Sequence, residues 1–171
     1  MVVKVSALPD EYFLEALKPL LKQIKLPFFL KRKFKKKALQ LHQSNTSHSQ
    51  RLKVLSDLIG GNSFFWKAGK DLLVAEGKNP DTHALLTLFI EHSSFNTYLF
   101  SQREEILEQL KFDKEGQLQI HVNLSLAYSG AVAPCGRKRG DILENSRSLK
   151  KEVPPCDNLR CACEWKLYEE D

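Results

Sequence analysis

The residues with the clearest chemical potential in this 171-residue chain are four cysteines gathered between residues 135 and 163. Twenty, four and one residues separate them in turn: Cys135, Cys156, Cys161 and Cys163. Clustered thiolates bind zinc in tetrahedral sites, and zinc binding would close the long segment between the first two cysteines. The spacing therefore predicts a structural zinc site made by all four thiolates.

Three alternatives for the cysteines remain open. A Cys-x-Cys pair on a straight strand places its sulfurs about 6–7 Å apart, which is far for a shared metal ion unless the chain bends. The same residues could form one or two disulfides or remain buried thiols. A catalytic thiol is the third alternative, with Cys135 or Cys163 as nucleophile and a histidine beside it in the fold. Neighbouring cations such as Arg137 and Arg160 favour the thiolates that a metal site needs.

A second chemical feature is a run of six cations in seven positions, within a first third (residues 1–60) that holds 12 basic and 4 acidic residues. The run and its interleaved aromatic residue are Lys31, Arg32, Lys33, Phe34, Lys35, Lys36 and Lys37. Clustered cations contact phosphates, and aromatic rings such as Phe28 and Phe29 stack on bases, so the run predicts nucleic-acid binding. A solvated helix face, an acidic protein partner and an anionic membrane surface are the alternatives.

The elements that carry these residues change character along the chain. Helical spacing predicts a helix after Pro9 that Pro19 kinks or splits, a break at Pro27 and a partly helical basic segment over 28–43. A polar loop over 44–50 follows. Further helices are expected over 52–59, over 62–77 with Asn62 as cap and Phe65 and Trp66 inside, and over 79–112 with Asn79-Pro80-Asp81 as start and a bend at Ser93-Ser94.

The period then changes from helical to alternating. Residues 117–128 alternate apolar and mostly polar side chains, which is typical of a strand with one buried face. Its expected partner is 161–168, with 2–5 as a weaker third strand. The predicted fold is mainly α with a small β appendage: a helical body over 1–112, containing the basic segment 28–43, and an appendage over 113–171 of two or three antiparallel strands closed by cysteines. Both tryptophans, Trp66 and Trp165, are expected in the core.

Residues 117–165 resemble the C-terminal part of the phage head-morphogenesis, or minor head protein, family. The strand LQIHVNLSLAY is followed by PCGRKRG and PPCDNLRCAC. Cys135, Gly140, the Pro154-Pro155 pair and the two last cysteines match the family pattern, whereas Lys138 stands where a second cysteine is usual. The resemblance implies a metal-stapled fold and a phage-type structural or assembly protein that binds protein partners.

Motifs of enzymes are absent from the sequence. It has no phosphate-binding loop, no dinucleotide-binding glycine pattern, no H-E-x-x-H and no G-x-S-x-G, and its five histidines are scattered. The first residues carry Asp10, Glu11 and Glu15 where a secretory signal needs an apolar run, so we expect a cytoplasmic setting that keeps thiols reduced. No apolar run is long enough to span a membrane. The function expected is a non-enzymatic, zinc-stapled module that binds nucleic acid or a nucleoprotein assembly, with an enzyme of unrecognised family as a further alternative.

Overall fold

The structure, a computed structural model, describes residues 8–44, 46–113, 117–124, 142–143, 159 and 163–169. It is mainly helical with a small antiparallel sheet, which confirms the predicted fold class. In chain order the elements are α1 (Asp10–Gln23), β1 (Ile24–Lys25), α2 (Phe28–Gln43), α3 (His48–Ile59), β2 (Phe65–Trp66), α4 (Lys67–Ala75), α5 (Thr82–Phe112), β3 (Leu118–Leu124), β4 (Ile142–Leu143) and β5 (Cys163–Glu169). The chain divides into two compact units, Met1–Tyr98 and Leu99–Asp171, and residues of α5 belong to both.

The first two helices form a hairpin whose limits follow from prolines. α1 begins directly after Pro9, with Asp10 and Glu11 in its first turn, where negative charge favours the helix dipole. It continues through Pro19 as a single helix, so of the two expected effects of this proline, a kink or a split, the split does not occur. Pro27 ends the connection, and α2 covers the whole basic segment over 28–43, which was expected to be only partly helical.

The third helix begins earlier than the apolar spacing indicates. The Ser47 hydroxyl accepts a hydrogen bond from the Gln50 backbone N–H at 3.3 Å, and the Gln50 side-chain oxygen accepts one from the Ser47 N–H at 3.2 Å. This reciprocal capping box starts the helix at His48, inside the segment expected to be a polar loop. The helix ends where expected, because Gly60 adopts a φ of 56° that glycine tolerates without strain.

The expectation of a helix from Asn62 through Phe65 and Trp66 is wrong. These two aromatic residues form β2, which pairs antiparallel with β1 in the register Ile24↔Trp66. The Asn62 side chain instead donates to the Ile59 carbonyl at 2.9 Å, at the end of α3, and α4 begins only at Lys67. Pairing with a strand about 40 residues away overrides the local helical pattern, because it satisfies backbone groups beside a fully buried tryptophan.

The long helix α5 also starts from a different cap than expected. The Asp81 carboxylate, not Asn79, accepts a hydrogen bond at 2.8 Å, from the Ala84 backbone N–H. The helix then runs uninterrupted past Ser93, whose hydroxyl donates to the Ile90 carbonyl at 3.0 Å. Side-chain hydroxyls that bond within their own helix let polar residues lie buried in it.

An aromatic cluster lies at the centre of the first unit. Phe89 of α5 meets three rings edge-on, at centroid distances of 5.6 Å to Phe34, 5.9 Å to Phe64 and 5.8 Å to Trp66. Edge-to-face pairs of this kind stabilise a core beyond the area they bury. The Trp66 indole N–H is satisfied as well, because it donates to the Gln23 side-chain oxygen at 3.1 Å.

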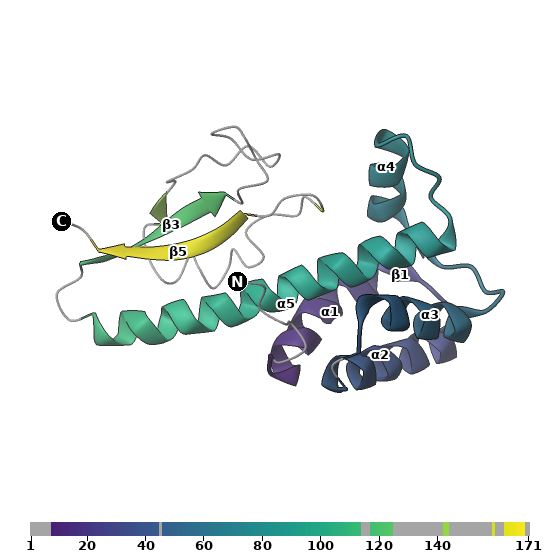
Figure 1. The fold of residues 1–171 in the computed structure, drawn as a ribbon, viewed down its shortest axis with the longest axis horizontal. Coiled ribbons are helices and arrows are strands. Elements are labelled where there is room, and N and C mark those ends of the chain that lie inside the picture. The colour runs from purple at the N-terminus through teal and green to yellow at the C-terminus, as the bar shows by residue number, and fades with distance from the viewer. Residues whose placement is uncertain are drawn as a thin grey trace. The chain divides into compact units, whose positions relative to one another are not determined.

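The second unit contains a three-stranded sheet in the order β4-β3-β5. β3 and β5 run antiparallel beside each other (Figure 1), with Val122 opposite Trp165, which confirms the predicted strand and its partner. The Gln102 side chain of α5 joins the helix to this sheet, since its oxygen accepts from the Trp165 backbone N–H at 3.1 Å. Ile120 and Trp165 are buried, as expected for the core face. The third strand expected at residues 2–5 lies outside the described residues, as do residues 125–128.

Candidate functional site

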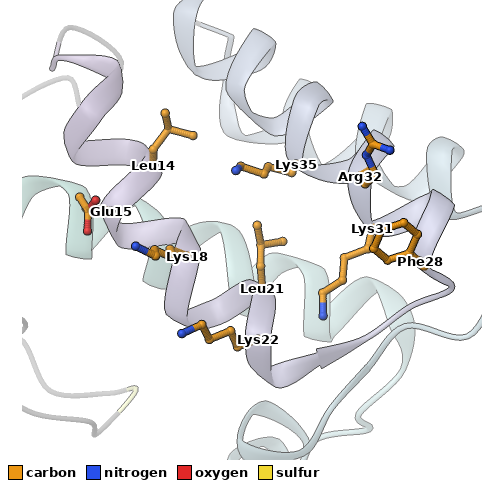
Figure 2. A pocket seen from close by; sticks show the side chains of 9 residues that line it. All are labelled: Leu14, Glu15, Lys18, Leu21, Lys22, Phe28, Lys31, Arg32 and Lys35. Atoms are coloured by element: carbon orange, nitrogen blue, oxygen red, sulfur yellow. The ribbon is translucent and has the colours of Figure 1, made fainter.

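A groove of about 490 Å³ lies between α1 and α2 in the first unit (Figure 2). It is bounded by five cations, one carboxylate and three apolar side chains, and its residues are Leu14, Glu15, Lys18, Leu21, Lys22, Phe28, Lys31, Arg32 and Lys35. Two facing helices with cations on both sides thus enclose a concave surface that has an apolar lining. Such a surface matches a ligand that combines negative charge with an apolar or planar part.

Helical spacing places the cations on both walls. Lys18 and Lys22 are four residues apart on α1, and Lys31 and Lys35 are four residues apart on α2, so each pair lies on one helix face. The hairpin turn at Pro27 brings the two pairs to the same groove. In Figure 2 the side chain of Lys35 extends from α2 toward α1. The positive charges of both helices, α1 and α2, are therefore directed at the same groove.

The electrostatics of the groove favour anions. Among the described residues, the five cations take part in no ion pair, and Glu15 is the single acidic residue of the lining. The Lys31 ammonium donates to the Ile24 carbonyl at 3.1 Å, which holds it at the end of the groove near β1. α2 starts without a side-chain cap and without an acidic residue in its first turn, so the positive end of its dipole adds to the same potential.

Two phenylalanines at the start of α2 are open to solvent. Phe28 is 78% exposed and Phe29 is 62% exposed, whereas Phe13, Phe34 and Phe64 are buried. Phe28 lines the groove and Phe29 does not. An aromatic ring that is left in water beside a cationic groove gains nothing for the fold, since the stabilisation of a phenylalanine comes from its burial.

The seven residues of the predicted nucleic-acid site divide among different environments. Lys31, Arg32 and Lys35 line the groove, and Lys33 and Lys36 are exposed on the same helix outside it. Lys37 is half-buried. Phe34 is fully buried against the rings of Phe64 and Phe89, so its side chain belongs to the core and presents no face to a ligand.

Sequence reasoning missed the α1 half of the groove. Lys18 and Lys22 were not singled out, because they lie outside the dense run of charge. Their signal was present: both fall on the polar face of a helix whose apolar stripe contains Leu17 and Leu20, at the four-residue spacing that aligns side chains. The helical periodicity of the sequence could not predict that α2 packs opposite these two lysines.

A second hollow of about 470 Å³ lies around the β1–β2 pairing. Its lining is Lys25, Leu26, Pro27, Ser63 and Phe65. The Phe65 ring is covered by two ammonium groups, with Lys25 at 5.4 Å and Lys70 at 5.8 Å from its centroid. These are cation–π distances, so the ring already has partners within the protein.

The four-cysteine site falls largely outside the described residues. Of its predicted ligands, Cys163 is described: it lies at the start of β5, opposite Leu124, and its side chain is 1% exposed. Cys135, Cys156 and Cys161 are outside the described residues. Within the part of the chain that the structure describes, no group of three or more histidine, cysteine, aspartate or glutamate residues is placed to hold a metal ion. The zinc site stays a prediction.

One histidine has a specific buried environment in the first unit. The His42 ring stacks on Phe13 at a centroid distance of 4.4 Å, and its Nε2 lies 3.1 Å from the Leu8 carbonyl oxygen. Burial lowers the pKa of His42 below its usual 6.5, and the positive charge of Arg51 lowers it further, although the Leu8 hydrogen bond and Asp10 act in the opposite sense. The neutral ring therefore joins the end of α2 to the start of α1 as a structural contact.

Comparisons with known proteins do not identify this chain: no family model, no curated protein and no solved structure matches it. The resemblance of residues 117–165 to the phage head-morphogenesis family accordingly stays a prediction. A separate finding concerns membranes, because none of the helices among the described residues is both long and apolar enough to cross a bilayer.

Proposed function

We propose that this protein is a non-enzymatic nucleic-acid-binding module, and that the groove between α1 and α2 binds the phosphate groups of its ligand. One observation carries the proposal: two helices direct five cations and a single carboxylate at one concave surface. A nucleic acid supplies closely spaced negative charges, and each phosphate neutralised by a lysine or arginine contributes to affinity.

The apolar lining of the groove supports a nucleic acid over a simple inorganic anion. Leu14, Leu21 and Phe28 contribute carbon surface between the cations. Sugars and bases offer apolar surface next to phosphate, so one ligand would satisfy both parts of the lining. The basic run on α2 extends the positive surface beyond the groove through Lys33 and Lys36, which gives a longer polyanion further contacts.

The test is a binding titration of the full chain with fluorescent oligonucleotides at a series of salt concentrations. We expect the logarithm of the association constant to fall linearly with the logarithm of salt concentration. Neutralising two groove cations, in the variant Lys18→Gln/Lys35→Gln, should reduce this slope by about 1.4 for single strands or about 1.8 for duplex DNA, because each lost phosphate contact removes about 0.7 or 0.9.

The matched control is Lys33→Gln/Lys36→Gln, which removes the same charge from exposed positions outside the groove. The groove variant should lose clearly more affinity and more slope than the control. Equal losses would mean that diffuse charge, and not the groove, attracts the ligand. A wild-type protein that binds no DNA or RNA at low salt would reject the proposed function.

A further inference from the structure

We infer that the nucleic acid recognised by this groove is single-stranded, and that Phe28 stacks on one of its bases. The inference rests on the proposed function and narrows it to a ligand class. It depends on the juxtaposition of an exposed aromatic ring with cations on the same helix face.

The position of Phe28 suits contact with a single nucleotide. Phe28 is at the first residue of α2, and Lys31 and Arg32 follow three and four residues later. Residues at these spacings are neighbours on a helix surface, with Cβ atoms about 5–6 Å apart. The ring and the two cations all line the groove, and Figure 2 shows Phe28 beside Lys31, so a base and its own phosphate can be bound together.

Exposure combined with a place in the groove separates Phe28 from the other aromatic residues of the first unit, since Phe29 is also exposed but does not line the groove. Phe34 is enclosed in the core, and the ring of Phe65 has ammonium groups over it. Phe28 is 78% exposed, so its ring has open surface for a base. Stacking on such a platform is tolerant of sequence because every base has a π-face.

The preference for a single strand over a duplex follows from how accessible the bases are in each. In a duplex, both faces of an internal base are covered by its neighbours, and a ring gains access only if a base pair is unstacked. A single strand offers its bases directly to an aromatic side chain while its backbone follows the cations. A groove that combines an open ring with lysines from two helices is thus better matched by a single strand.

An anionic membrane is the competing ligand, because exposed phenylalanines beside lysines are also typical of helices that lie in a bilayer interface. The concave shape argues against it. Five of the eight lysines and arginines of α1 and α2 line a hollow between these two helices. A flat bilayer surface would not reach the Leu14 and Leu21 side chains that line the same hollow. Vesicle binding is accordingly an arm of the test.

The experiment compares a fluorescent oligothymidylate with a mixed-sequence duplex of equal length, at one moderate salt concentration, for the wild-type chain and three variants. Phe28→Leu removes the ring and keeps an apolar side chain, Phe28→Tyr keeps the ring, and Phe29→Leu is the matched control at an exposed phenylalanine outside the groove. Thermal unfolding followed by circular dichroism shows that each variant is folded. Co-sedimentation with vesicles of phosphatidylcholine and phosphatidylserine in equal parts measures membrane binding.

We expect the wild-type chain to bind the single strand more tightly than the duplex. Phe28→Leu should weaken single-strand binding by about 5-fold to 150-fold, the effect of losing one base–aromatic stack, and should leave the salt slope and the duplex affinity unchanged. Phe28→Tyr and Phe29→Leu should bind as the wild type does.

Failure of the inference differs from failure of the proposed function. If both nucleic acids bind equally well and Phe28→Leu changes neither, the groove binds phosphate but the single-strand inference is wrong. Equal losses from Phe28→Leu and Phe29→Leu would also overturn it. If neither oligonucleotide binds while vesicles sediment the protein, the proposed function itself is rejected and the membrane is the ligand.

Discussion

Gly69, in the first turns of α4, is expected to be intolerant of even one added methyl group. A Cβ atom built there would lie 2.5 Å from Cε3 and 2.9 Å from Cδ2 of the Trp66 ring. The ring has no room to move away, since it is fully buried, lies edge-on to Phe89 at 5.8 Å and donates its N–H to Gln23 at 3.1 Å. Gly69→Ala should therefore strain the core.

The expected magnitude is the difference between two opposing effects. Alanine favours an α-helix over glycine by about 1 kcal/mol. Overpacking a core by one carbon costs roughly 1–3 kcal/mol, and a 2.5 Å contact with a confined ring belongs at the upper end. The free energy of unfolding should thus fall by about 2 kcal/mol, which lowers the midpoint of thermal unfolding by roughly 4–8 °C for a chain of this size.

The assay is equilibrium unfolding in urea followed by far-ultraviolet circular dichroism. Gly61→Ala is the matched control, because a Cβ there meets no atom within 4 Å and the residue lies outside the left-handed region. It should leave stability unchanged or raise it by about 0.4–1 kcal/mol. Combining Gly69→Ala with Trp66→Phe, which shortens the ring system, should give a smaller loss than the sum of the single variants. A Gly69→Ala protein as stable as the wild type would refute the described packing of Trp66 on α4.

Two further predictions concern a buried histidine and the cysteines. Because the pKa of His42 is lowered in the folded protein, the unfolded chain binds more protons below pH 6.5, so stability should be full above that pH and fall as the pH drops through the folded pKa. Urea unfolding between pH 7 and pH 5 should show this fall in stability for the wild type and a smaller fall for His42→Gln. The control His83→Gln, at an exposed position, should behave as the wild type. Equal pH dependence of stability in all three proteins would contradict the lowered pKa of His42 as its cause. For the cysteines, elemental analysis of freshly purified, reduced protein should find one zinc ion per chain, released when thiols are alkylated, and Cys135→Ser should lower the zinc content while α1 to α5 stay folded. Protein that is folded and free of metal would contradict the four-thiolate site.

Much of the local structure could be read from the sequence. Pro9 and Pro27 mark where the first two helices begin, because proline is tolerated at a helix start and restricts the residue before it. The alternation after residue 117 identified β3 and β5 as partners, because a side-chain period of two with one buried face is hard to produce otherwise. These features depend on short-range sterics and on patterns within a few residues.

The errors fall where distant segments decide the outcome. Residues 65–66 read as part of a helix, but they pair with Ile24 and Lys25, and no local pattern records a partner so far along the chain. The cap of α5 is Asp81 and not the expected Asn79, since the choice between two capping residues that flank Pro80 depends on which carboxylate or amide reaches the Ala84 N–H. Both cases are consequences of geometry that appears only once the chain is folded.

For the candidate site, the sequence by itself determined the ingredients: a basic helix over 28–43 with phenylalanines beside the cations. Only the tertiary structure decided their roles. Phe34 and Phe28 have the same side chain, but α2 packs one against Phe89 and leaves the other in water, because six residues of helix place them on different faces. The groove exists because the hairpin brings Lys18 and Lys22 opposite Lys31 and Lys35, and a binding surface made by two helices is a property of how they pack rather than of either helix alone.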